Sequence, residues 1–126
     1  HFIPGPAPIE LPEKITVSAS SRSGTRFENI ENAGAGNLPS IPVKSGCIQL
    51  TASGEPIILG PDCGTTGGYQ VAGVVIESDL HKLANLKIGQ TVRLVAVSPD
   101  NAGVLNKQFT DELSRAITRP TQLGSW

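Results

Sequence analysis

The chain has 126 residues, enough for one domain with a hydrophobic core. Its formal net charge of −1 gives no electrostatic reason to expect nucleic acid or an anionic membrane as a partner. No apolar run approaches the roughly 18 residues of a membrane-spanning helix, so we expect a soluble, cytoplasmic protein. The 14 glycines, 10 prolines and 4% aromatic residues favour a loop-rich β-protein over a helical bundle.

Strands are predicted wherever β-branched and apolar residues alternate or run together. These segments are 15–19, 25–28, 47–50, 56–59, 71–76 and 91–97. Residues 52–55 are expected to join two of them as a hairpin, and 31–42 to form a loop. Prolines cannot donate to a strand ladder, so the proline-rich residues 1–12 should form an extended or edge segment.

Two brief helices are predicted. Ser78 can cap the first, which would turn Leu80, Leu83 and Ala84 toward the strands. Residues 99–103 read as a turn, after which Thr110 can cap a helix over 111–117. Residues 121–126 read as a tail. The many short strands and few helices predict a mainly β domain with a barrel-like closure.

The two cysteines, Cys47 and Cys63, are too few for a disulfide framework. Cys47 lies in an apolar strand and is expected to be buried. Cys63 lies in a glycine-rich loop, where a reactive thiol is the less favoured interpretation, and a bridge between the two stays open. His81 should be a solvated histidine, and no metal-binding motif is present.

Residues 60–69, GPDCGTTGGY, are the chemically richest segment. Glycines let another group approach the main chain, so successive N–H groups can form a cradle for an oxyanion. The alternative is a long structural turn, in which Asp62 only bonds its own backbone. No Gly-Lys-Ser/Thr follows the glycines, so ATP could be used only by a partner subunit.

The ordered segments SSRSGTRF (20–27), SGCIQL (45–50), GEPI (54–57), TTGGY (65–69) and IGQTVR (88–93) resemble one known family. It is the C-terminal part of the urea amidolyase-related family, which includes allophanate hydrolase subunit 2 and the C subunit of 5-oxoprolinase. The domain is also similar to one half of the carboxyltransferase of urea carboxylase. The resemblance covers about residues 20–98. The family usually carries Arg-Gln where this chain has Cys63 and Gly64, and Pro where it has Gln70.

This resemblance implies a cyclophilin-like, partly open β-barrel with one or two short helices. The chain would be one domain over 1–126, the C-terminal portion of a carboxyltransferase-like subunit. Residues 1–14 would be its extended segment and 99–126 its C-terminal extension. A second cyclophilin-like subunit or domain of the same enzyme is the implied partner.

The resemblance also implies three functions and leaves open whether the chain is itself an enzyme. The first is a urea carboxylase-like carboxyltransferase for a small urea- or amide-type substrate, using carboxybiotin on a partner carrier. The second is part of an ATP-dependent 5-oxoprolinase, which opens a cyclic amide. The third is a non-catalytic regulatory module that binds another protein. No metal, nucleic acid or membrane is implied.

On the enzymatic interpretations, Asp62 orients the substrate nitrogen, Thr65 and Thr66 donate hydroxyl hydrogen bonds, and Tyr69 packs on the ligand or hydrogen-bonds it. The main-chain amides of the loop would form the cradle, with Gly64, Gly67 and Gly68 as its glycines. Arg22 and Arg26 match the family segment and would hold a carboxylate or bicarbonate, unless they are ordinary surface arginines.

Overall fold

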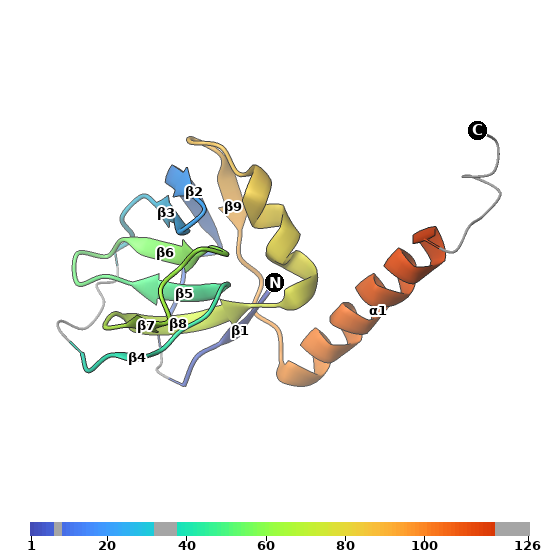
Figure 1. The fold of residues 1–126 in the computed structure, drawn as a ribbon. Coiled ribbons are helices and arrows are strands. Elements are labelled where there is room, and N and C mark those ends of the chain that lie inside the picture. The colour runs from blue at the N-terminus through green and yellow to red at the C-terminus, as the bar shows by residue number, and fades with distance from the viewer. Residues whose placement is uncertain (7–8, 32–37, 118–126) are drawn as a thin grey trace.

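The computed structural model describes residues 1–6, 9–31 and 38–117 (Figure 1). Seven strands form one curled sheet in the order β1-β8-β5-β6-β3-β2-β9, and neighbouring strands are antiparallel. They are β1 (Phe2–Pro4), β2 (Lys14–Ser21), β3 (Gly24–Phe27), β5 (Cys47–Leu50), β6 (Pro56–Leu59), β8 (Gln70–Val75) and β9 (Thr91–Arg93). A separate pair, β4 (Ile41–Pro42) and β7 (Thr66–Gly67), lies beside this sheet.

The two ends of the curled sheet meet. After β9 the chain returns to β1, where Phe2 and Ala96 form an isolated parallel bridge. The Phe2 N–H donates to the Val95 carbonyl, and the Val97 N–H donates to the Phe2 carbonyl, each at 2.9 Å. The sheet is therefore a barrel closed by one short bridge, which agrees with the predicted barrel-like closure.

The strands of the sheet bury one face in a shared core. Alternate residues of a strand point to opposite faces, so Ile48 and Ile58 lie on the same side as Phe27. These three side chains are at most 2% exposed. The core cluster consists of Phe2, Ile15, Val17, Phe27, Ile48, Ile58, Ala72 and Val75.

The opposite, outer face of β5 and β6 is also buried. Cys47, Ile57 and Leu59 form a second apolar cluster there, against which Val43 and Cys63 pack. Both covering residues belong to the segments around β4 and β7. These two strands are therefore covered on both faces, by the core on one and by loop segments on the other.

The first helix, η1 (Glu77–Asn85), is a 3₁₀ helix that packs on the barrel. Leu80 and Leu83 contact the core cluster as predicted, whereas Ala84 is exposed, because a 3₁₀ helix with three residues per turn aligns Leu80 with Leu83 only. The predicted Ser78 cap is wrong, because the helix begins after Ile76 without a side-chain cap. Ser78 is buried instead, and its N–H donates to Asn106 Oδ1 at 2.9 Å.

The second helix, α1 (Pro99–Ile117), has 19 residues and projects away from the barrel (Figure 1). The predicted turn at 99–103 and the predicted cap at Thr110 are both wrong. Ser98 Oγ accepts the Asn101 N–H at 3.2 Å, and Pro99 occupies the first turn. A serine cap followed by proline is a common start of a helix, and the same residues were read as a turn. Thr110 lies inside the helix and donates to the Asn106 carbonyl.

All of the predicted strands are present, with ends that shift by a few residues; the last stops at Arg93 rather than residue 97. β1 lies at one end of the strand order, as the proline-rich start predicts, and within the described part of the chain its free side is bridged only at Phe2. β4 and β7 were not predicted, and β4 lies within the predicted 31–42 loop. Residues 32–37 of that loop and the 121–126 tail lie outside the described residues. Neither described helix has the length and hydropathy needed to cross a bilayer.

Replacing Phe27 with alanine should lower the free energy of unfolding by about 3–5 kcal/mol, because its ring is completely buried and a cavity would remain. Ile88→Ala is the matched control, since Ile88 is 74% exposed, and should change stability by less than about 0.5 kcal/mol. Urea denaturation followed by circular dichroism measures both. Equal losses for the two variants would contradict this assignment of the core.

Candidate functional site

A cavity of about 350 Å³ lies between the outer face of the sheet and the glycine-rich segment 60–69. The sheet side comprises β3, β6 and β5. We call this space the outer-face cavity. Its lining residues are Ser21, Ser23, Gly24, Arg26, Val43, Gln49, Ile57, Leu59, Asp62, Cys63, Gly64, Thr66, Gly67, Gly68 and Tyr69.

Main-chain hydrogen bonds hold the segment 60–69 in place at both of its ends. At the start, Gly60 N–H donates to the Ser23 carbonyl and Asp62 N–H to the Arg22 carbonyl, at 3.0 and 2.9 Å. At the end, β7 pairs with β4, and Val43 N–H donates to the Thr65 carbonyl at 3.0 Å. The segment is therefore a fixed wall of the cavity.

Two glycines of this segment, Gly60 and Gly67, serve close approach rather than a left-handed backbone. Positive φ angles occur at Gly46, Gly54 and Gly89, and at none of the glycines between 60 and 68. A Cβ on Gly60 would collide with the Arg22 carbonyl oxygen, and a Cβ on Gly67 would collide with Gln49 Nε2. The close approach that these two glycines permit is therefore to groups of the protein itself.

Asp62 forms a bidentate pair with Arg22. Arg22 Nε lies 2.8 Å from Asp62 Oδ2, and the second contact, Nη2 to Oδ1, is 3.4 Å. The Arg22 hydrogen bond and, second, its positive charge hold the pKa of the Asp62 carboxyl below its ordinary value. Asp62 is therefore an ion-paired carboxylate at the edge of the cavity. Arg22 also borders a neighbouring cavity of about 610 Å³ on the other side of the β2–β3 turn.

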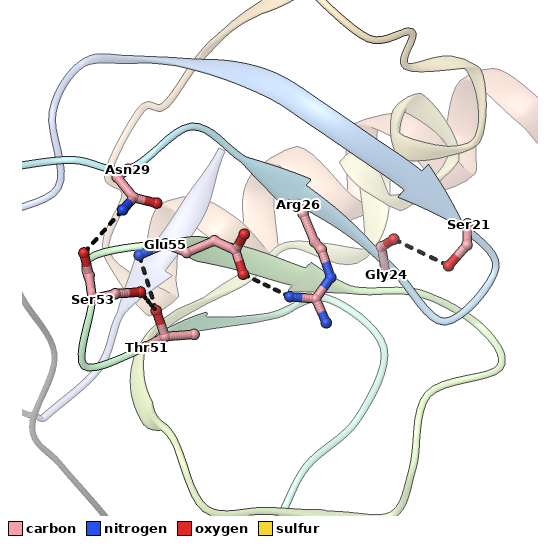
Figure 2. Close-up of polar contacts among 7 residues, drawn as sticks. All are labelled: Ser21, Gly24, Arg26, Asn29, Thr51, Ser53 and Glu55. Carbon is pink, nitrogen blue, oxygen red and sulfur yellow. Dashed lines mark hydrogen bonds and ion pairs between the residues drawn. The ribbon is translucent and has the colours of Figure 1, made fainter.

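Arg26 is also paired with a carboxylate, that of Glu55, through one contact. Figure 2 shows the two side chains pointing toward each other, and Arg26 Nη1 lies 2.6 Å from Glu55 Oε1. Glu55 is positioned by the β5–β6 turn, where its N–H donates to Thr51 Oγ1 at 3.0 Å. Both arginines proposed as carboxylate holders thus already bind carboxylates of the chain.

The structure brings most of the predicted site residues together. Those that line the cavity are Asp62, Gly64, Thr66, Gly67, Gly68, Tyr69 and Arg26. Thr65 and Arg22 are not among its lining residues. Tyr69 is 47% exposed, at the border with an apolar groove that includes Leu38 and Ile41.

Gln49 lines the cavity and was not among the predicted site residues. It lies in the middle of β5 and is only 5% exposed. None of the described residues makes a hydrogen bond with its side-chain amide. The available signal was a lone amide side chain within the apolar strand CIQL. A buried polar side chain without a protein partner needs another explanation, such as an ordered water, an ion or a ligand.

The two cysteines are free thiols. Cys47 is buried, as predicted, and Cys63 is partly buried against the same outer cluster. His81 is exposed, and its ring stacks on Phe109 with centroids 5.1 Å apart. Within the described ranges, no three His, Cys, Asp or Glu side chains gather as a metal site requires.

The family described as "Carboxyltransferase domain, subdomain A and B" matches residues 12–96. Because this match spans more than half of the chain, the chain belongs to that family. The C subunit of the Haemophilus influenzae 5-oxoprolinase is 36% identical over 105 residues, which cover 79% of this chain and 34% of that protein. The C subunit of the Escherichia coli 5-oxoprolinase is 33% identical over 87 residues, 68% of this chain and 28% of that protein.

The fold agrees with this family. A crystal structure of the Kluyveromyces lactis urea carboxylase matches with a TM-score of 0.71 and 25% identity, covering 81% of this chain and 10% of that one. The chain spans about a third of the length of the curated relatives it matches. The predicted family and the barrel-like fold class are confirmed, and of the predicted short helices, η1 is short and α1 is long.

Arg22→Ala should raise the pKa of the Asp62 carboxyl toward its ordinary value, because its main hydrogen-bond donor is removed. The pKa is lowered in the folded state, so the pair stabilises the protein above the unfolded-state pKa. This contribution is lost as the pH falls through the folded-state pKa. NMR titration of the side-chain carboxyl carbon measures the change. Arg26→Ala is the control, and an equal shift of the Asp62 pKa in both variants would contradict the pairing.

Gly60→Ala should lower the free energy of unfolding by about 1 kcal/mol or more, because a Cβ would meet the Arg22 main chain. Gly103→Ala, in α1 and with open space around it, should raise stability by about 0.5–1 kcal/mol. Thermal unfolding of both variants tests the two signs. A neutral Gly60→Ala would show that the start of the 60–69 segment is not packed as described.

Proposed function

We propose that this chain is the carboxyltransferase-like part of a multi-subunit enzyme that acts on the N–C=O group of a small urea or amide. The observation that carries the proposal is the lining of the outer-face cavity, in which neutral hydrogen-bonding groups outnumber charged ones. Gln49, Thr66 and Tyr69 supply side-chain donors and acceptors there. The charged side chains Arg26 and Asp62 are each neutralised by a partner.

The predicted roles of the loop residues are retained in this proposal. Asp62, as a carboxylate held by Arg22, would orient or deprotonate a substrate nitrogen. The Thr66 hydroxyl and main-chain amides between Gly64 and Gly68 would stabilise a developing oxyanion. Tyr69 would pack on the ligand. Thr65 would contribute less directly, since its carbonyl anchors the segment through Val43.

The resemblance to biotin-dependent carboxyltransferases makes carboxybiotin on a partner carrier the proposed carboxyl donor. The ureido ring of biotin is itself a neutral N–C=O group, so neutral hydrogen-bonding groups of the cavity such as Thr66 and Tyr69 suit it. Bound there, the cofactor would supply the carboxyl group for transfer. Arg26 would then hold that carboxylate only by exchanging its present partner, Glu55.

Ring opening of 5-oxoproline is the second candidate, and the names of the two curated relatives favour it. The substrate is a cyclic amide and would use the same neutral groups of the cavity. ATP would be bound by a partner subunit. In either case a second cyclophilin-like subunit or domain is the expected partner, and a cytoplasmic location stays a prediction from the sequence.

The test of this function is a turnover screen of the chain co-expressed with its partner subunits. Urea, simple amides and 5-oxoproline are supplied with ATP, with and without a biotin carrier. Turnover that requires the carrier supports carboxyl transfer, and ATP-dependent loss of 5-oxoproline without it supports the second candidate. A stable complex that consumes none of these compounds would overturn both and favour a regulatory module.

Asp62→Asn should lower turnover of the assembled enzyme by about 100-fold, because an amide cannot accept the substrate proton. The fold should persist, because the side chains of Asp62 and Arg22 are both exposed and an exposed ion pair contributes little to stability. Asp111→Asn is the matched control: Asp111 is also an ion-paired surface aspartate, held by Lys107 at 2.8 Å on α1. Steady-state kinetics with circular dichroism measures both, and undiminished turnover in Asp62→Asn would remove its proposed role.

A further inference from the structure

We propose that Gln49 is the residue that makes the outer-face cavity specific for a neutral amide, by pairing its side-chain amide edge to edge with the N–C=O group of the ligand. The inference rests on the proposed function, because it assigns the substrate recognition of the same cavity. It concerns a residue outside the glycine-rich segment, on a different strand.

The first support is the burial of Gln49. Its side chain is surrounded by apolar neighbours on the outer face, with Cys47 two residues before it and Ile57 directly across the ladder. Only 5% of the residue is exposed, and none of the described residues hydrogen-bonds its amide. The amide therefore has no partner in the described part of the protein, although the rest of the residue is enclosed by apolar neighbours. A ligand that lies in the cavity would supply partners for both its donor and its acceptor.

The amide of Gln49 also has access to the space of the cavity. Among the described residues, no side-chain nitrogen or oxygen is both sealed from solvent and without a hydrogen-bond partner. Since Gln49 lines the cavity, its small exposed fraction must include the amide atoms. A ligand in the cavity can therefore reach this amide without any movement of the strand.

The second support is how closely β7 lies over this amide. Gly67 pairs with Ile41 in the β4–β7 ladder, which fixes its position. A Cβ at residue 67 would collide with Gln49 Nε2, so the amide can keep this position only beside a glycine. The Gln49 side chain is therefore positioned beside Thr66 and Gly68, the neighbours of Gly67 that also line the cavity.

The third support is the charge around the cavity. Arg26 is bound by Glu55 at 2.6 Å, and Asp62 is bound by Arg22 at 2.8 Å. Gln49 offers one acceptor oxygen and an NH₂ donor, which match the N–H and C=O of an amide or urea. A carboxylate has acceptor oxygens only, so one of them would face the Gln49 carbonyl oxygen. Recognition by Gln49 thus favours the amide over the corresponding acid.

Two probes of nearly equal shape separate this role from simple shape selection. These are 2-pyrrolidone, a cyclic amide, and γ-butyrolactone, which has a ring oxygen in place of the N–H. The full chain should bind the amide about tenfold more tightly than the lactone, because a site that hydrogen-bonds an N–H rejects an analogue without it. NMR titration of the ¹⁵N-labelled chain measures both affinities. Equal affinities for the two probes would overturn the inference.

Gln49→Met keeps the length of the side chain and removes its donor and acceptor. The variant should lose the preference for the amide and bind 2-pyrrolidone about tenfold more weakly, while its thermal stability stays the same or rises. A residue needed only for folding would give the opposite stability change. Gln108→Met, on the exposed side of α1, is the matched control and should bind both probes like the parent. Unchanged amide binding in Gln49→Met would overturn the inference.

Gly67→Ala tests the contact between β7 and the amide. It should weaken 2-pyrrolidone binding by about tenfold, because the added Cβ displaces Gln49 Nε2. Adding Gln49→Ala should recover the stability lost in Gly67→Ala without recovering binding. Full binding by Gly67→Ala, or recovered binding in the double variant, would contradict the role of Gln49.

The assembled enzyme separates this inference from the proposed function. Amide-selective binding that depends on Gln49, without turnover of any urea or amide, would support the inference and overturn the proposed function. Turnover of an amide that is undiminished in Gln49→Met would support the proposed function and overturn the inference.

Discussion

The burial of β5 and β6 on both faces is the constraint on which the arrangement of the site depends. Ile48 and Ile58 face the barrel core, so Cys47 and Ile57 must be covered from the other side. That cover comes from Val43, beside β4, and from Cys63 in the 60–69 segment, which includes β7. Moving this segment away would return apolar surface to water at about 25 cal/mol per Å². The wall of the cavity is thus stabilised by the same burial that stabilises the fold.

The second constraint is the pairing of charges around the cavity, where each arginine is bound by a carboxylate of the chain. Arg22 and Asp62, and Arg26 and Glu55, are salt bridges between side chains that are partly exposed. Such exposed pairs contribute little to stability, typically below about 1 kcal/mol. Their more important effect is on recognition, because they leave a nearly neutral cavity in which hydrogen-bond geometry rather than net charge selects a ligand.

The sequence predicted those parts of the structure that depend on local patterns. Alternating apolar residues located the main strands, and the contiguous TTGGY segment located one wall of the cavity. β4 and β7 have two residues each, too few for any pattern, and exist only because they pair with each other. The partners of the two arginines lie 40 and 29 residues away in the chain. Gln49 was not predicted as a site residue, because a single polar residue within an apolar strand is normally part of a buried strand and carries no motif.

The bridge between Phe2 and Ala96 gives the barrel a mechanical property. The two bridged segments run in the same direction. A force that pulls the chain before Phe2 one way and the chain after Ala96 the other way therefore slides the two segments along each other. The two hydrogen bonds of Phe2, to Val95 and Val97, are then loaded together in shear rather than broken one after the other. A barrel closed by so short a contact therefore resists pulling along this direction more than its small number of hydrogen bonds suggests.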